Sequence, residues 1–356
     1  MTMNEENTIK EIPYRKYCIC FLSFSAAALL AAALLVVLAD PFFQYHKPLA
    51  GLFYQVDNKL NQNPGMARHF DYDSVIVGSS MTINFDTELF RQKMGLDTIK
   101  LSYDGAYPKD VDTIMKIVEE SDRSLSAVFL DIDIYTYKNA PGLTAYEIPA
   151  YLYDQNPLNN IPYLLNKEVI LQYIIRPQVE RESTPINEIY WIWPVMYYGK
   201  EFVAQTYHAP TEFLPSIAEN SYSQNISDNL NSCIIPHIES MPDTEFYVFF
   251  PPYSILYWYD RYADGTLAAE LSGIGQIVET LSAYPNVKLF YFQDQFDYIT
   301  DLAHYTDYTH YNHDMNDFIT ECFAGDRCRI TKENCAEILD TMYRYLSSCD
   351  FEQYVP

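Results

Sequence analysis

The C-terminal part of the chain contains a segment, HYTDYTHYNHDMND (304–317), in which three histidines and three aspartates lie within fourteen residues. This composition has three chemical interpretations. The first is a metal site, because imidazole nitrogen and carboxylate oxygen both bind metal ions; the candidate ligands are His304, Asp307, His310 and His313. The second is the acid–base half of a hydrolase triad, formed by Asp307 and His310. The third is a polar loop without catalytic function.

The spacing of Asp307 and His310 favours the triad. A carboxylate three residues before a histidine can accept the imidazole Nδ1–H within a tight turn. That bond fixes the tautomer and leaves Nε2 able to take a proton from a serine. The mechanism therefore requires a serine from elsewhere in the chain.

A suitable serine is predicted in VGSSMT (77–82), where Ser79 and Ser80 follow a short apolar run and precede a helical segment. The N–H groups at the start of a helix are unpaired and create positive potential. A nucleophile and part of an oxyanion hole are therefore expected there, with Ser79 beside the pocket. The alternative is a small-residue turn in which a serine caps the helix.

Other polar residues are expected at the ends of neighbouring strands. Gly105 in SYDGAYP (102–108) would let the backbone approach a ligand and present an N–H. Asp131 and Asp133 close the run LDIDIY (130–135), and Tyr253 and Ser254 follow the two prolines of PPYS (251–254). Asp133, Tyr253 and Ser254 are candidate pocket residues, although simple strand termination is the favoured explanation of both pairs.

The elements that would position these residues alternate between strands and helices. Short β-branched or aromatic runs predict strands at 73–78, 97–102, 126–135, 246–253 and 287–294. Helical spacing predicts helices at 85–95, 108–122, 266–284, roughly 312–323 and 332–348. This alternation is typical of a parallel sheet covered by helices, in which ligands bind at the carboxyl ends of the strands. Ser80 and the Asp307–His310 pair would then meet at one end of the sheet.

Residues 17–39 contain no charged side chain, and their 23 residues are long enough to cross a hydrocarbon core of about 30 Å. Lys10, Arg15 and Lys16 precede this run and Asp40 follows it. The positive-inside rule then predicts that this run spans the plasma membrane, with the N-terminus in the cytoplasm and the following domain outside. A cleaved signal peptide is the alternative, although its apolar region is usually only about 7–15 residues long.

The predicted organisation has four parts: a cytoplasmic tail (1–16), a transmembrane anchor (17–39), a juxtamembrane segment (40–70) and one α/β domain (71–356). An insertion at about 136–220 separates the third and fourth strands and includes the aromatic run YWIWPVMYY (190–198). It is too long for a plain connection. We expect a cap or a substrate-binding elaboration there.

The net charge of −25 argues against a nucleic-acid partner, because phosphate binding needs a basic face. Five cysteines lie beyond the anchor, and Cys322 with Cys328 or Cys335 with Cys349 are candidate disulfide pairs. Their spacing does not resemble the paired CxxC pattern of a zinc site.

The order VGSSMT, SYDGAYP and then DYTHYN after the last strand resembles the SGNH-hydrolase superfamily. More narrowly, it resembles the membrane-anchored extracytoplasmic branch, which includes the D-alanyl transfer protein of teichoic-acid modification and the alginate O-acetylation proteins. The resemblance covers roughly 70–135 and 245–345. It implies a three-layer α/β/α domain of flavodoxin-like type with a five-stranded parallel sheet.

The resemblance also implies roles for individual residues. Ser80 matches the nucleophile, His310 the general base and Asp307 the residue that orients it. The Ser80 and Gly105 N–H groups match the oxyanion hole. The superfamily usually adds an Asn side chain from a G-x-N-D block, whereas this chain has LDIDIY there, so the departure falls at Asp133.

The function expected from these matches is that of an extracytoplasmic serine esterase or acyltransferase. Its substrate would be the acyl groups of a cell-envelope glycan or teichoic-acid-like polymer, without a metal or organic cofactor. An acyl-exporting membrane protein is a candidate partner. The alternatives are a catalytically inactive SGNH-like envelope protein that binds a glycan or a protein, and a metal-dependent hydrolase built on the histidine segment.

Overall fold

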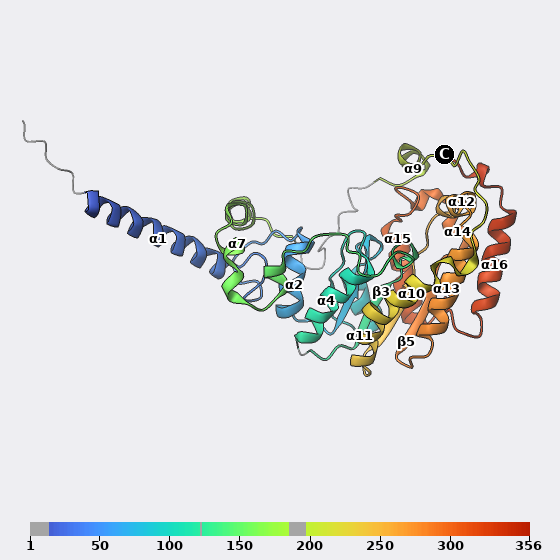
Figure 1. The fold of residues 1–356 in the computed structure, drawn as a ribbon, viewed down its shortest axis with the longest axis horizontal. Helices are drawn as coiled ribbons and strands as arrows, with labels where there is room; N and C mark the ends of the chain where they lie inside the picture. The colour runs from blue at the N-terminus through green and yellow to red at the C-terminus, as the bar shows by residue number, and fades with distance from the viewer. Residues whose placement is uncertain (1–13, 122, 185–196) are drawn as a thin grey trace, which may run out of the picture. The chain divides into compact units, whose positions relative to one another are not determined.

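The computed structural model describes residues 14–121, 123–184 and 197–356 (Figure 1). The chain divides into two compact units. One, called the anchor unit, combines the residues up to Pro41 with Pro48–Gln55 and Asp154–Ser183. The other, called the sheet unit, combines Phe42–Lys47, Val56–Tyr153 and Thr184–Pro356.

The anchor unit is built around α1 (Tyr14–Ala39), the long dark-blue helix of Figure 1. Its sequence is rich in Ala and Leu, which are strong helix formers. Among the described residues, α1 is the one helix long and apolar enough to cross a membrane. The short helices α7 (Ile161–Leu164) and η3 (Val169–Ile175) pack against α1, and α8 (Arg176–Glu180) continues from η3.

The sheet unit contains one five-stranded parallel sheet in the order β2-β1-β3-β4-β5. Its strands are β1 (Ser74–Val77), β2 (Thr98–Lys100), β3 (Ala127–Asp131), β4 (Glu245–Phe250) and β5 (Val287–Tyr291). All five predicted strands are confirmed, each shorter than predicted. The largest difference is at β3, which ends at Asp131 because Asp133 caps the short helix α5 (Ile134–Tyr137) by accepting the Tyr135 N–H at 3.1 Å.

Helices follow each strand of the sheet (Figure 1). The helix α3 (Thr87–Met94) begins at the N-cap Asp86 and ends at Gly95 in the left-handed conformation, and α4 (Pro108–Glu120) begins at a proline. The other main helices are α10 (Ser223–Asn229), η7 (Leu230–Ile234), α11 (Ile235–Ser240), α12 (Ile255–Ala263), α13 (Leu267–Leu281), α15 (His313–Gly325) and α16 (Cys335–Ser348). The five predicted helices correspond to α3, α4, α13, α15 and α16.

An aromatic cluster fixes α15 on the sheet. Phe323 of α15 packs on Phe129 of β3, Phe249 of β4 and Phe290 of β5, with ring centroids 4.9–5.6 Å apart. Phe85, which precedes α3, makes an edge-on contact with Phe249 at 5.7 Å. Because α15 begins within the histidine segment, at His313, this packing also sets where that segment lies.

The two units cut across the predicted boundaries. The predicted juxtamembrane segment is divided, and its helix α2 (Lys59–His69) belongs to the sheet unit. The predicted insertion is divided as well, because 154–183 belong to the anchor unit whereas α9 (Lys200–Thr206) belongs to the sheet unit. Of the aromatic run, 190–196 lie outside the described residues, so its role as a cap stays a prediction.

The cysteine predictions have different outcomes. All described cysteines are free, with Cys322 and Cys328 Sγ atoms 3.5 Å apart. The pairing of Cys335 with Cys349 is wrong, because these residues lie at opposite ends of α16. A helix of that length separates its ends by roughly 20 Å, whereas a disulfide needs Cα atoms within about 7 Å.

Candidate active site

The loop after β1 holds the candidate nucleophile in a constrained backbone. Gly78 has φ of +139°, and a Cβ there would lie 1.7 Å from Asp131 Oδ1. Only glycine therefore fits. Ser79 then caps the single turn η1 (Ser80–Thr82) by accepting the Met81 N–H at 3.3 Å. These constraints place Ser80 at the start of a helical turn, as predicted.

Asp131, at the end of β3, holds this loop in place. Its carboxylate accepts the Ser79 N–H at 2.9 Å and the Ser79 hydroxyl at 2.6 Å. Both side chains are almost fully buried. Burial raises the pKa of Asp131 to about 7, and the Ser79 hydrogen bonds only partly offset that rise. Ser79, predicted to lie at the pocket, is therefore a buried positioning residue.

The loop before α15 folds into a tight turn around Asp307. Tyr305 and Tyr311 form a short antiparallel bridge, and the Thr306 N–H donates to the His310 carbonyl at 3.0 Å. Asp307 Oδ1 accepts the N–H groups of Thr309 and His310, both at 2.8 Å. The Asp-x-x-His spacing thus produces the turn predicted from it.

The structure brings the three predicted catalytic side chains together. Ser80 Oγ lies 2.8 Å from His310 Nε2, although 230 residues separate them. His310 Nδ1 lies 2.7 Å from Asp307 Oδ2. Because Asp307 accepts the Nδ1 proton, Nε2 is the acceptor for the serine hydroxyl. This is the arrangement of a Ser-His-Asp triad.

The environment of Asp307 keeps it ionised. Burial opposes the charge, but the bonds from the His310 imidazole and from the two backbone N–H groups outweigh it and lower the pKa of Asp307 to about 2. An ionised Asp307 can stabilise the imidazolium that forms when His310 takes a proton.

Two residues after β4, Pro252 and Ser254, make hydrogen bonds to the segment that contains the Asp307–His310 turn. Ser254 is fully buried and donates its hydroxyl to the Tyr308 carbonyl at 2.6 Å. Tyr305 donates its phenol hydroxyl to the Pro252 carbonyl at 2.7 Å. Ser254, predicted as a possible pocket residue, therefore positions the Asp307–His310 turn.

Asp133 and Tyr253 form a second buried contact near the triad. The Tyr253 hydroxyl donates to Asp133 Oδ1 at 2.5 Å, and Tyr253 is almost completely buried. Burial raises the pKa of Asp133, against the Tyr253 and Tyr135 hydrogen bonds that lower it. Asp133, at which the sequence departs from the asparagine expected from the resemblance, is thus a half-buried carboxyl.

The oxyanion hole predicted from the Ser80 and Gly105 N–H groups stays a prediction. Gly105 has φ of +62°, and a Cβ there would meet no atom within 4 Å. The loop that contains Gly105 is hydrogen-bonded to the loop after β1, because the Tyr103 N–H donates to the Gly78 carbonyl at 3.0 Å. Within the described residues, neither the Ser80 nor the Gly105 N–H donates to a protein acceptor.

Asn63 is a positioning residue that the sequence analysis did not identify. It lies on α2, is fully buried, and donates its side-chain amide to the Ser102 carbonyl at 3.1 Å. Ser102 in turn shares a hydrogen bond of 2.5 Å with Thr82 in the nucleophile turn. In the sequence, Asn63 is one polar residue in the juxtamembrane segment, where no pattern predicts a structure.

The alternative metal ligands are not assembled. His304 Nε2 faces Asp301 at 3.8 Å, and His313 Nε2 faces Asp314 at 3.3 Å. Across the described parts of the chain, no group of three or more His, Cys, Asp or Glu side chains is arranged to hold a metal ion. His313 instead opens α15, capped by Asn312, which accepts the Met315 N–H at 3.3 Å.

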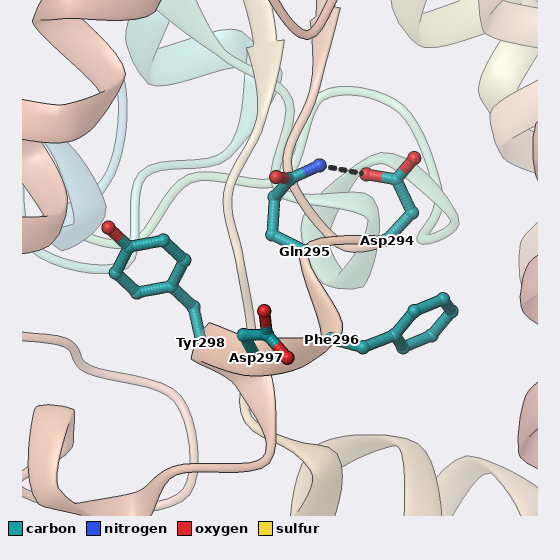
Figure 2. A pocket seen from close by; sticks show the side chains of 5 residues that line it. All are labelled: Asp294, Gln295, Phe296, Asp297 and Tyr298. Atoms are coloured by element: carbon teal, nitrogen blue, oxygen red, sulfur yellow. Dashed lines mark hydrogen bonds between the residues drawn. The ribbon is translucent and has the colours of Figure 1, made fainter.

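A separate pocket lies after β5 (Figure 2). Its lining comprises Asp294, Gln295, Phe296, Asp297 and Tyr298. The Gln295 side-chain amide donates to Asp294 Oδ1 at 2.8 Å, as drawn there. The lining includes none of Ser80, Asp307 and His310.

No protein-family model matches the sequence, and no curated protein matches it either. The membership of the chain in the SGNH hydrolases is therefore a proposal, which rests on the site itself.

Proposed function

We propose that this protein is an extracytoplasmic serine esterase or acyltransferase of SGNH type. The observation that carries the proposal is the connected set Ser80–His310–Asp307, with distances of 2.8 and 2.7 Å. Such a set activates a serine for attack on an acyl carbonyl. The two N–H groups predicted for the oxyanion hole would stabilise the negative charge that develops on the carbonyl oxygen.

The reaction proceeds in two halves. Ser80 Oγ attacks the acyl carbonyl carbon while its proton passes to His310 Nε2. The tetrahedral intermediate then collapses, the bond to the leaving alcohol breaks, and His310 returns the proton to that alcohol. Water or a sugar hydroxyl next attacks the acyl-Ser80 carbonyl carbon while its proton passes to His310 Nε2. The bond from the acyl carbon to Ser80 Oγ then breaks and His310 returns the proton to Ser80, so that a free acid or an acylated sugar leaves.

A three-layer fold of flavodoxin-like type is consistent with this proposal. In this strand order, the connection from β1 to β2 moves one way across the sheet, and the connection from β2 to β3 moves the other way. Right-handed crossovers then place α3 and α4 on opposite faces. The packing of α3 on α15, and of α4 on α11 and η7, agrees with two separate helical layers.

The location follows from α1. The uncharged part of α1, which follows Arg15 and Lys16 in the first turn of that helix, favours a single-pass anchor with a cytoplasmic N-terminus in the plasma membrane. The sheet unit would then act outside the membrane, where acylated glycans or teichoic-acid-like polymers are the available substrates. An acyl-exporting membrane protein would supply the acyl group in the transferase version.

A fluorophosphonate probe on the full-length protein in detergent tests the nucleophile. Labelling is expected at Ser80, and Ser80→Ala is expected to abolish both labelling and ester hydrolysis. Ser348→Ala, on an exposed face of α16, is the matched control and keeps both. If Ser80→Ala retains esterase or acyl-transfer activity, the mechanism is wrong.

A non-catalytic envelope protein that binds a glycan or protein is the second candidate. The observation that favours it is Asp133, because an ionised carboxylate would repel a developing oxyanion. Failure of the probe to label a folded protein would support this second function.

A further inference from the structure

The surface of the anchor unit carries an exposed apolar stripe along η3 and α8. Leu171, Ile175 and Val179 follow one another at four-residue spacing, and their exposed fractions are 49, 44 and 76%. Residues at this spacing lie on one side of a helix. Contiguous exposed apolar side chains are uncommon on a surface that faces only water.

The neighbouring stripe of the same helical segment is polar. It consists of Gln172, Arg176 and Glu180, each one position after an apolar residue, and Arg176 Nε lies 2.9 Å from Glu180 Oε1. The remaining side contains Val169, Ile174 and Pro177, which are buried. The segment therefore has a buried face and two exposed faces, one apolar and one polar.

The packing on α1 sets the depth of this segment. Along α1, the less exposed positions lie mainly from Ala32 onward, and Val36 is fully buried. Asp40, directly after α1, accepts the Tyr163 hydroxyl of α7 at 2.8 Å. The helices α7 and η3 therefore cover the C-terminal end of α1.

The covered end lies at the boundary of the hydrocarbon layer if α1 crosses the membrane. Eight residues from Ala32 to Ala39 extend roughly 10 Å along the helix axis. Amphipathic helices of membrane interfaces bury their apolar face about 5–10 Å into the headgroup and acyl boundary. The depth fixed by α1 matches the depth at which such a helix lies.

We propose that 169–180 form an interfacial element whose stripe Leu171, Ile175 and Val179 is embedded in the outer leaflet beside α1. The occupant of this surface is the lipid bilayer itself, and Gln172, Arg176 and Glu180 face the headgroups. The anchor is then a helix that crosses the membrane together with a second segment that lies in its surface. This inference rests on the anchor and is independent of the catalytic triad.

Tryptophan scanning in brominated lipid tests the proposal. The full-length protein is reconstituted into phosphatidylcholine vesicles with or without bromine on the acyl chains, as Leu171→Trp, Val179→Trp and, for the polar stripe, Gln172→Trp and Glu180→Trp. The signal of each added tryptophan is the difference from the wild-type protein, which has three. At least a twofold greater quenching by bromine is expected for the first two variants than for the second two.

Equal, weak quenching of all four variants would overturn the proposal. The vesicles contain no other protein that could shield the stripe from the lipid, so this result would mean that the stripe is not embedded. Ile175→Trp repeats the test if one apolar-stripe variant does not fold, as judged by near-UV circular dichroism. Resistance to alkaline carbonate extraction reports insertion of α1 separately. Failure of the anchor and failure of the interfacial element are thereby distinguished.

Discussion

At the scale of single residues, the site depends on carboxylates held in different states. Hydrogen bonds from His310 and Thr309 lower the pKa of Asp307 and keep it ionised, whereas burial raises the pKa of Asp131, whose carboxyl is bonded to Ser79. In the proposed mechanism, the Asp307 carboxylate would stabilise the positive charge that forms on His310. Asp131 holds the loop from which Ser80 projects.

Asp307→Asn tests the first of these roles. The amide cannot hold the His310 tautomer, so kcat for ester hydrolysis is expected to fall roughly 10³- to 10⁴-fold. Steady-state kinetics on the purified full-length protein measures the change. Asp314→Asn, at an exposed carboxylate in the same segment, is the control and stays within about threefold of wild type. A loss of less than tenfold in Asp307→Asn would argue against the triad.

Gly78→Ala tests the constraint on the nucleophile loop. Gly95→Ala is the matched control, because Gly95 also has positive φ but open space around a Cβ. The control is expected to cost roughly 1–2 kcal/mol for the left-handed backbone. Gly78→Ala adds overlap with Asp131 and is expected to cost at least about 2 kcal/mol more. Thermal unfolding in detergent measures both, and equal melting temperatures would contradict the steric role of Asp131.

The sequence predicted the residues of the triad better than it predicted their supports. Ser80 and the Asp307–His310 pair stand at recognisable positions, after a buried strand and within an Asp-x-x-His turn. Asn63 acts through Ser102, a residue on another loop, and no local pattern encodes such a contact. Ser254 was identified, but its partner, the Tyr308 carbonyl, is a backbone atom that sequence patterns do not reveal.

At the scale of elements, periodicity identified the strands and the helices beside them, because each buries one continuous face. Helical spacing also predicts a helix near 165–180, where η3 and α8 lie, but it could not show that 154–183 belong to the anchor unit, because their apolar side chains have two kinds of surroundings. Some, such as Ile174, pack within the anchor unit, whereas others, such as Leu171, are exposed. A segment whose apolar side chains are partly buried and partly exposed has no single stripe that faces the core.

The end of α15 offers a prediction at this scale. Cys322 lies on α15 and Cys328 on the turn that follows, with Sγ atoms 3.5 Å apart. In an oxidising compartment we expect these thiols to form a disulfide, which would stabilise the fold by about 2 kcal/mol through closure of a short loop. Peptide mass spectrometry without reductant should find the linked pair. Recovery of both thiols unlinked from protein made in the envelope would contradict it, and Cys233, buried elsewhere, should stay reduced.

At the scale of the whole molecule, the pKa of Asp131 predicts how stability changes with pH. Because the folded state holds this proton up to about pH 7, whereas the ordinary value is 3.8, rising pH favours the unfolded chain across that window. Asp131→Asn imitates the protonated form. Its stability relative to wild type should therefore increase by about 1.4 kcal/mol per pH unit between the two values.

Thermal unfolding of both proteins from pH 4 to 8 measures this difference. Asp243→Asn, at an exposed position before β4, makes the same change in charge and is the control. A stability difference between wild type and Asp131→Asn that stays constant across the range would contradict the buried, protonated state of Asp131.

The bond between Asp40 and Tyr163 joins residues 123 positions apart. A ribosome adds about 5–20 residues per second. The end of α1 is therefore complete for on the order of ten seconds before α7 exists to cover it. During that interval β1, β2 and β3 are synthesised, so the anchor unit closes only after more than half of the sheet has emerged. The cover over the C-terminal end of α1 is thus added late in biosynthesis, and a stalled or truncated chain would leave that helix end uncovered.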